Sequence, residues 1–217
     1  ASRALVEALQ DIAIISSRAD IKSELIKELD RQAANLERMR DQPGVNRKAL
    51  NGFLGEINTA AEALRTQELP IGQAIRDDEL LQGVAQRGSL PGGTCGFDLP
   101  EYHHWLGQPI RERHRQVTLW SEDLEPVKAA ISLQLSLIRA SAMPRRVLAR
   151  QGLYQESLEA PAPVQMIRIL VDGDTSLFPE ISGHKHRFAI RFLRGNGQAP
   201  PEPIRDDLEF SLTCCAL

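Results

Sequence analysis

The residue types best suited to bind a charged partner lie in the segment Ile181–Phe192, which reads ISGHKHRFAIRF. Alternate residues of a β-strand point to the same face, so an extended conformation places Lys185, Arg187 and Arg191 on one face, with Ala189 between the two arginines. Cations at this spacing span about 20 Å of surface. Because guanidinium groups bind carboxylates through paired hydrogen bonds, we expect this face to suit an extended peptide of acidic or mixed charge.

The opposite face of this segment is apolar and gives a simpler interpretation of the same pattern. It carries Phe188, Ile190 and Phe192, and by the same parity we expect His184 and His186 to be partly buried beside them. Outward charges that alternate with inward apolar residues are typical of any antiparallel strand with one solvated face. The pattern alone therefore leaves two interpretations open, a solvated strand and a binding surface.

The balance of charge limits the kinds of partner. The chain has 217 residues and a formal net charge of −3, whereas a protein that binds nucleic acid without sequence preference is usually basic overall. Basic residues are nevertheless concentrated locally, since Pro144–Arg194 contains eight Lys and Arg residues against five acidic ones. We expect a local basic surface on a mildly acidic protein. A nucleic-acid-binding module that uses the same basic face remains the alternative to a peptide-binding protein.

The sequence lacks the common catalytic signatures. It contains no phosphate-binding loop, no glycine fingerprint for a dinucleotide, no nucleophile elbow and no H-E-x-x-H pair. The histidines and cysteines match no standard zinc spacing, and the adjacent Cys214 and Cys215 should point to opposite faces of a strand, one buried and one exposed. We therefore expect no enzyme, no cofactor and no metal. The odd number of three cysteines favours a reducing compartment.

Helical periodicity dominates the first part of the chain, where apolar residues recur every three or four positions. The expected helices are Ile21–Met39, Asn46–Leu64, Gly72–Gln86, Arg111–Trp120 and Ser121–Ala142. Ser121 is expected to cap the last of these helices, and the acidic residues that follow it favour the helix dipole. We expect a helical bundle domain at residues 1–90, continued by the helices at about 109–142.

After Pro144 the apolar period becomes two. The expected strands are Gly152–Leu158, Val164–Asp172, His186–Leu193 and Asp207–Thr213. No helices separate these strands, so their sheet should be antiparallel. A short strand is also expected at Thr94–Asp98, and Gly183 is expected to supply a turn. The sequence predicts an α+β fold, in which the N-terminal helical bundle packs with an antiparallel β-sheet domain at residues 91–108 and 144–217.

The segment Leu99–Leu106 (LPEYHHWL) gathers aromatic residues and histidines at Tyr102, His103, His104 and Trp105. Aromatic residues are enriched at protein interfaces, where they act as anchors. A helix start that Trp105 packs onto the sheet explains the segment equally well. The sequence leaves these two interpretations open.

Several short segments, spread in order over most of the chain, are specific in combination. They are Ser23–Arg31 (SELIKELDR), Pro91–Pro100 (PGGTCGFDLP) with the following His103 and Trp105, Phe178–Phe192 (FPEISGHKHRFAIRF), and Leu208–Cys215, which ends in paired cysteines. Together they resemble the ZapD family of Z-ring-associated proteins.

The resemblance implies a symmetric homodimer of a two-domain, non-enzymatic protein that acts in the cytoplasm at the mid-cell division site. Proteins of this family bind the C-terminal tail of FtsZ, the tubulin-like division GTPase. They cross-link and bundle its filaments, which stabilises the Z-ring in cell division. Neither a membrane nor a nucleic acid is implied as a partner.

The resemblance also implies a basic surface that binds the tail. By position this surface includes Arg18, His103, Arg187 and Arg191, and we add Lys185 and Arg76 because of their charge and proximity to the motifs. The family usually opens with a further helix that carries basic residues, and this chain starts after it. Part of the site or of the dimer is therefore expected to lie outside this numbering.

Overall fold

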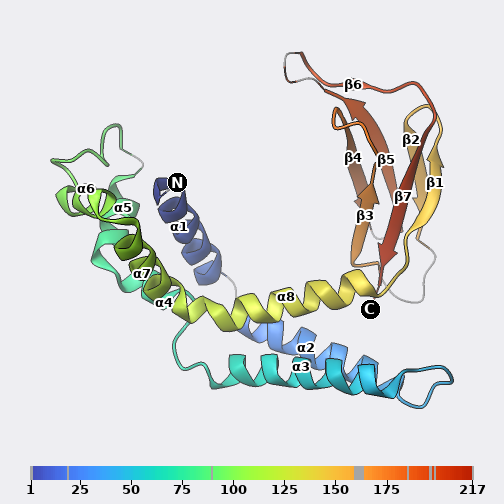
Figure 1. Ribbon diagram of the computed structural model, residues 1–217, viewed down its shortest axis with the longest axis horizontal. Coiled ribbons are helices and arrows are strands. Elements are labelled where there is room, and N and C mark those ends of the chain that lie inside the picture. Colours follow the sequence, from blue (N-terminus) through green and yellow to red (C-terminus); the bar gives the residue numbers. More distant parts are fainter. Residues whose placement is uncertain are drawn as a thin grey trace. The chain divides into compact units, whose positions relative to one another are not determined.

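The computed structural model describes residues 2–18, 20–88, 90–158, 164–184, 186–195, 197 and 199–216. The chain folds into two compact units, Ala1–Leu133 and Gln134–Leu217. Helices build the first unit and antiparallel strands make up most of the second (Figure 1). The predicted α+β fold is confirmed.

The helices match most of the predicted segments and divide one of them. They are α1 (Ser2–Arg18), α2 (Ile21–Arg38), α3 (Arg47–Thr66), α4 (Gln73–Asp77), α5 (Glu79–Arg87), α6 (Pro100–Gly107), α7 (Ile110–Ser121), the short 3₁₀ turn η1 (Glu122–Leu124) and α8 (Glu125–Ala140). The helix expected at Gly72–Gln86 is interrupted at Asp78, whose carboxylate accepts a hydrogen bond from the Leu81 amide at 3.0 Å and caps α5. The predicted cap at Ser121 is wrong, because this hydroxyl donates back to the Val117 carbonyl of α7 at 2.8 Å.

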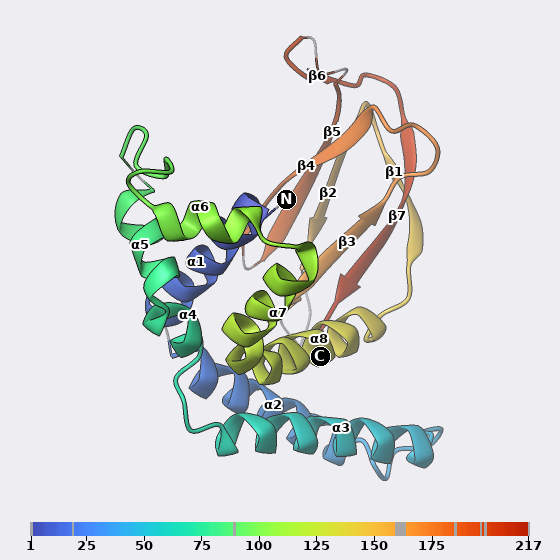
Figure 2. The same cartoon turned by 60° about the vertical axis from the view of Figure 1, so that its left-hand side comes forward.

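Helices α2 and α3 lie side by side as an antiparallel hairpin (Figure 2). Asp20 caps α2 by accepting from the Ser23 amide at 3.1 Å, and Asn46 caps α3 by accepting from the amides of Lys48 and Ala49, both at 3.1 Å. The apolar stripes of the two helices are buried at Leu29, Leu36, Leu50, Leu54, Ile57, Ala61 and Leu64. Each buried leucine contributes about 1.5–3 kcal/mol to the stability of this hairpin.

The remaining helices of the first unit share a core with aromatic residues at its centre. Its buried members are Val6, Leu9, Ala13, Ile75, Leu81, Val84, Tyr102, Trp105 and Trp120. The ring centroids of Trp105 and Trp120 lie 5.4 Å apart, and Tyr102 stacks on Trp105 at 6.1 Å. Residues 91–108, which we expected in the β domain, therefore belong to the helical unit, and turns and bends replace the strand expected at Thr94–Asp98.

Two antiparallel sheets form most of the second unit. The strands are β1 (Arg145–Ala149), β2 (Leu153–Ser157), β3 (Met166–Leu170), β4 (Leu177–His184), β5 (Arg187–Arg194), β6 (Glu202–Pro203) and β7 (Leu208–Cys215). One sheet has the order β1-β7-β3, and the other has the order β2-β5-β4 with β6 beside β5. Strands β1, β4 and the two-residue β6 were not predicted. Gly183 lies within β4 rather than in a turn, and Pro179 and Gly183 together obscure the strand pattern of this segment.

The core of the second unit lies between the two sheets. Phe188, Ile190 and Phe192 of β5 are buried in one cluster with Phe210 and Leu212 of β7. The rings of Phe192 and Phe210 meet edge to face, with centroids 4.9 Å apart. This packing fixes which face of β5 is turned toward solvent. Among the described residues, no helix is both long and apolar enough to cross a membrane.

Candidate functional site

The outer face of the sheet β2-β5-β4 carries the two arginines predicted for binding. Arg187 and Arg191 are exposed, whereas Phe188, Ile190 and Phe192, which alternate with them along β5, are at most 3% exposed. The two predicted faces of β5 are therefore confirmed. Because the apolar side is packed into the core, the strand itself holds the arginines at the surface.

The strand register shows which side chains accompany these arginines. Residues directly opposite each other in an antiparallel pair project from the same face of the sheet. The rows across the outer face are Ser157, Arg187 and His184, then Gln155, Ala189 and Ser182, then Leu153, Arg191 and Glu180. The middle row, which we call the low row, has small side chains at Ala189 and Ser182. It separates the two arginines.

A hollow of about 550 Å³ lies over one end of this face. Its lining includes Gln155, Ala189 and Ser182 of the low row and Ser157, Arg187 and His184 of the row beside it. Arg187 and Arg191 are four residues apart on one strand, which corresponds to about 13 Å. The surface therefore offers two guanidinium groups at a spacing suited to carboxylates on an extended chain, with space between them.

The two arginines differ in their protein partners. The Nε–H of Arg187 donates to Nε2 of His184 at 3.1 Å, whereas Arg191 has no hydrogen bond or ion pair within the described residues. Glu180, which lies opposite Arg191, is the only acid that the described register places on this face. The predicted partial burial of His184 and His186 is wrong, because His184 belongs to β4 and both residues are exposed where β4 and β5 meet.

Neighbouring arginines of the second unit are neutralised by acids. Arg145 forms an ion pair with Glu156, which also accepts a hydrogen bond from the Tyr154 hydroxyl at 2.6 Å. Burial lowers the pKa of Arg145, but its hydrogen bonds to Glu156 and Tyr154 outweigh this effect, so its pKa is raised and it stays charged. The pKa of Tyr154 is raised, mainly by burial of the hydroxyl and secondly by its hydrogen bond to Glu156. Arg146 pairs with Asp172 at 2.7 Å, so both arginines are less available than Arg187 and Arg191.

Arg76, predicted as a site residue, is partly engaged within its own unit. It lies on α4, is half-buried, and donates to the Ile71 carbonyl at 2.9 Å and to Oε1 of Gln73 at 3.0 Å. A hollow of about 570 Å³ brings Arg76 together with Ser16 and Ser17 near the end of α1. Arg76 thus combines a structural role with a position on a concave surface.

The structure describes His103 in full, but it describes only part of Arg18 and nothing of Lys185. His103 is exposed on α6, and its ring lies against Gly96, where an added Cβ would be 3.4 Å from the ring. Arg18 ends α1, but its side chain lies outside the described residues, as does all of Lys185. Arg76 and His103 belong to the first unit, whereas Arg187 and Arg191 belong to the second. One surface shared by all six residues therefore stays a prediction.

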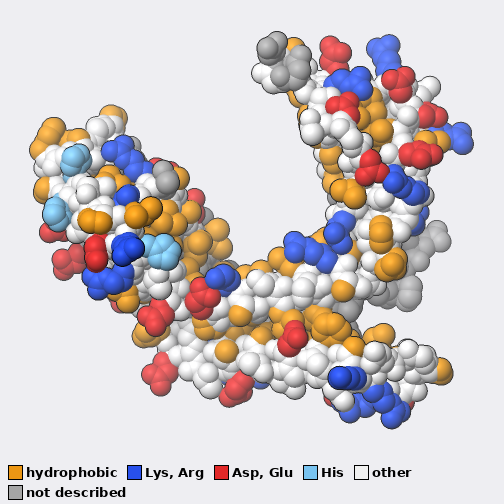
Figure 3. All heavy atoms as spheres, in the orientation of Figure 1, with side chains coloured by type: hydrophobic (Ala, Val, Ile, Leu, Met, Phe, Trp, Pro, Cys, Tyr) orange, Lys and Arg blue, Asp and Glu red, His pale blue; other side chains and the backbone are white. Residues whose placement is uncertain are grey.

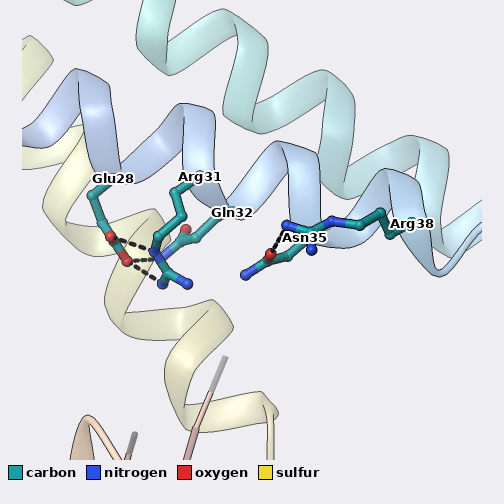
Figure 4. A network of polar contacts seen from close by, with 5 residues as sticks. All are labelled: Glu28, Arg31, Gln32, Asn35 and Arg38. Atoms are coloured by element: carbon teal, nitrogen blue, oxygen red, sulfur yellow. Dashed lines mark hydrogen bonds and ion pairs between the residues drawn. The ribbon is translucent and has the colours of Figure 1, made fainter. Parts of the chain in front are cut away.

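Helix α2, which carries one of the segments of the family resemblance, neutralises its own charge (Figure 4). The Glu28 carboxylate accepts from Nη2 and Nε of Arg31 at 2.6 and 2.8 Å and from Nε2 of Gln32 at 3.1 Å. Arg38 donates to Oδ1 of Asn35 at 2.8 Å. An acidic peptide would have to compete with Glu28 for Arg31, so this helix is a weaker candidate than β5.

Basic side chains also gather at the free end of the α2–α3 hairpin (Figure 3). Here Arg40 pairs with Glu37 at 2.7 Å, and Arg47 lies 3.6 Å from Asp41. These exposed pairs add little to stability, yet they reduce the net positive charge of the surface. Over the strands of the second unit, the face drawn in Figure 3 shows basic and acidic side chains interspersed.

The aromatic segment on α6 is mainly structural. Tyr102 and Trp105 are buried, at 3% and 4% exposed, and only His103 and His104 are exposed. The packing interpretation is therefore correct for the two large rings. They pack into the core of the helical unit, to which α6 belongs.

The paired cysteines give no sign of thiol chemistry. Cys215 is buried and Cys214 is half-buried, so the expectation of one exposed thiol is wrong. Burial raises the pKa of Cys214, which disfavours the reactive thiolate. Within the described part of the chain, no three His, Cys, Asp or Glu side chains gather as metal ligands.

Sequence reasoning missed the residues that β4 adds to the site. His184, Ser182 and Glu180 lie beside Arg187, Ala189 and Arg191 because β4 pairs with β5 along its whole length. Their signal in the sequence is the alternation of polar residues at 180, 182 and 184. Pro179 and Gly183 hide this alternation, since both residues are typical of turns.

Comparison with known proteins identifies the family. A family model described as "ZapD: Cell division protein" matches residues 1–191. Cell division protein ZapD from Methylococcus capsulatus is 41% identical over 215 residues, which covers 99% of this chain and 84% of that protein. Proteins of the same name from Azoarcus sp. and Escherichia coli are each 37% identical and cover 95% of this chain, and the matches span 82% and 81% of those proteins. The resemblance seen in the sequence is therefore confirmed, and the chain belongs to the ZapD family of cell division proteins.

Proposed function

We propose that this protein is a non-enzymatic accessory protein of cell division that binds the C-terminal tail of FtsZ and cross-links its filaments at the Z-ring, in the cytoplasm. The observation that carries the proposal is the outer face of β5, where exposed Arg187 and Arg191 flank the low row. Membership of a family of cell division proteins supplies the biological setting.

The chemistry of the outer face suits an extended acidic tail. Two carboxylates about 13 Å apart on a peptide would reach both guanidinium groups at once. A hydrogen bond to a charged group contributes about 1.5–3 kcal/mol, so two such contacts support a weak but specific association. The small side chains of Ala189 and Ser182 leave open space between the two contacts.

Cross-linking follows if the protein is a symmetric dimer, as we propose with the tail site. A two-fold dimer presents two equivalent sites. A filament displays one tail for each of its subunits, so weak contacts add up through avidity when both sites are engaged. Bundling results when the two sites of one dimer hold tails of different filaments.

The nucleic-acid alternative has less support. The phosphates of a nucleic acid would also pair with Arg187 and Arg191, but the net charge of the chain is −3 and the register places Glu180 beside Arg191. Single-stranded nucleic acids are usually bound with aromatic rings on which bases stack. On the outer face of the described strands, the aromatic rings are those of Phe178, which is 40% exposed, and His184, which is engaged by Arg187.

The test of the proposal is a double charge reversal, Arg187→Glu with Arg191→Glu. We expect this variant to lose binding of the tail peptide by about 100-fold or more, since each lost contact costs about tenfold or more. Its co-sedimentation with FtsZ filaments should also be lost. Both residues are exposed, so the free energy of unfolding should change by only about 0.5 kcal/mol.

The matched control is a second double reversal, Arg146→Glu with Arg168→Glu. It makes the same change in net charge within the same unit, and both side chains are exposed and belong to strands of the other sheet, β1-β7-β3. We expect this variant to keep most of its binding. Normal binding by the Arg187 and Arg191 variant, or an equal loss in both variants, would show that the site lies elsewhere.

A further inference from the structure

Strand β4 forms a free edge of its sheet. It pairs with β5 from Leu177, opposite Arg194, to His184, opposite Arg187. Strands β2 and β6 lie on the other side of β5, and among the described residues no strand pairs with the outer side of β4. The backbone groups along such an edge are available to pair with another extended chain.

The hydrogen bonds of Phe192 show which way the backbone of β5 points. Its amide donates to the Gly152 carbonyl at 2.8 Å, and its carbonyl accepts from the Ile204 amide at 3.1 Å. Both bonds run toward the β2 and β6 side. In an antiparallel ladder the direction of these bonds alternates with each residue, so Phe188 and Ile190 also bond away from β4.

The residues of β4 opposite these positions must therefore direct their backbone groups to the free edge. They are Pro179 opposite Phe192, Ile181 opposite Ile190 and Gly183 opposite Phe188. Ile181 and Gly183 each offer an N–H donor and a carbonyl acceptor there, whereas Pro179 has no N–H. Pro179 thus restricts the available pairing to the short stretch from Glu180 to His184.

The side chains on the two faces of this edge differ in chemistry. On the outer face, Ser182 and His184 adjoin Arg187, whose guanidinium is exposed. On the opposite face, Ile181 belongs to the apolar side of the sheet but is 49% exposed, because no strand covers it in the described structure. A strand added here would place alternate residues beside a basic surface and beside an apolar one.

We propose that the filament tail binds this protein as an added β-strand on the free edge of β4, between Glu180 and His184. The inference rests on the proposed tail-binding function and specifies its geometry and its sequence preference. Main-chain hydrogen bonds to Ile181 and Gly183 supply part of the affinity, as in other cases of strand addition. The preferred segment is extended, with acidic residues toward Arg187 and apolar residues toward Ile181.

The first test removes one backbone donor from the free edge. Ile181→Pro deletes an N–H that points away from β5, so the pairing of β4 with β5 should persist, as it does at the native Pro179. We expect the affinity for the FtsZ tail peptide to fall at least tenfold. The matched variant Ile181→Val keeps the N–H and a β-branched apolar side chain, and should bind within about threefold of the parent.

The second test leaves the protein unchanged and therefore does not depend on the folding of a variant. Two tail peptides are made. One is N-methylated at the odd positions of the binding segment, and the other is N-methylated at the even positions. An added strand uses only one set of its amides toward β4, so one peptide should lose binding at least tenfold and the other should bind nearly as the parent does. Equal binding by the two peptides would overturn strand addition.

The outcomes separate this inference from the proposed function. If the Arg187 and Arg191 reversal abolishes binding while both methylated peptides bind equally, the tail-binding function stands and strand addition is wrong. If the reversal leaves tail binding intact, the proposed site is itself wrong. If Ile181→Pro dissociates protein oligomers in sedimentation and leaves peptide affinity unchanged, the edge is occupied by a second copy of the chain, and the inference is wrong.

Discussion

Asp78 joins two parts of the helical unit through a single carboxylate. One oxygen accepts from the Leu81 amide at 3.0 Å, which caps α5, and the other accepts from Nε1 of Trp120 at 2.7 Å. Trp120 is 3% exposed and lies in the aromatic centre of the core. The same side chain therefore satisfies a helix end and a buried indole, and this double role explains why the helical pattern is broken at this residue.

We expect Asp78→Ala to destabilise the protein by about 2–4 kcal/mol. The loss of the cap accounts for about 1 kcal/mol, and the indole N–H that is left buried without an acceptor adds about 1–3 kcal/mol. Asp77→Ala is the control, because Asp77 is exposed and accepts only from the Gln73 side chain. Urea unfolding followed by tryptophan fluorescence measures both variants, and an equal midpoint for Asp78→Ala and the parent would contradict this role.

Strand β5 owes its position to its apolar face. Phe192 is fully buried, and its ring meets that of Phe210 with centroids 4.9 Å apart. Truncation of a buried phenylalanine removes transfer free energy and leaves a cavity. Because Phe192 lies next to Arg191 in the chain, the stability of the core and the orientation of the binding surface depend on adjacent residues.

We expect Phe192→Ala to lower the free energy of unfolding of the second unit by about 3–5 kcal/mol. Phe178→Ala on the neighbouring β4 is the matched control, since Phe178 is 40% exposed and should cost much less. Hydrogen exchange of the β5 amides is a suitable measurement, because it reports on this strand separately from the helices. Equal protection in the two variants would show that the Phe192 ring does not anchor β5.

Regular alternation is what made parts of this fold predictable. Strand β5 and its two faces follow from the run of Arg187, Phe188, Ala189, Ile190 and Arg191, where large apolar residues alternate with arginine or with a small residue. Helices α2 and α3 follow from long apolar stripes with Asp20 and Asn46 as caps. In these elements, local preference and tertiary packing agree.

Prediction failed where local signals and tertiary packing differ. Strand β4 contains Pro179 and Gly183, which normally mark turns, but an edge strand tolerates both. The strand expected at Thr94–Asp98 placed residues 91–108 in the β domain, yet Trp105 packs with Trp120 in the helical core. Half of the candidate site was therefore missed, since His184, Ser182 and Glu180 reach Arg187 and Arg191 only through the pairing of β4 with β5.

On the scale of the whole molecule, the proposed interaction depends on a few exposed charges in a chain of net charge −3. We expect the affinity for the tail peptide to fall as salt is raised from about 0.1 to about 1 M, because the Debye length shortens from about 10 to about 3 Å. Fluorescence anisotropy of a labelled tail peptide measures this dependence. Sucrose at matched viscosity serves as a control, and an affinity that does not change with salt would indicate apolar binding in place of ion pairing.

The free guanidinium of Arg191 also bears on how quickly a complex forms. A carboxylate that reaches this group displaces water and breaks no ion pair within the described protein, and at Arg187 it competes only with the hydrogen bond that Arg187 donates to the His184 ring. Capture should then be limited by diffusional encounter and not by rearrangement of the surface. If the protein cross-links filaments as proposed, rapid exchange of single tails would allow a bundle to be remodelled while the ring constricts, although many tails would hold it together at any moment.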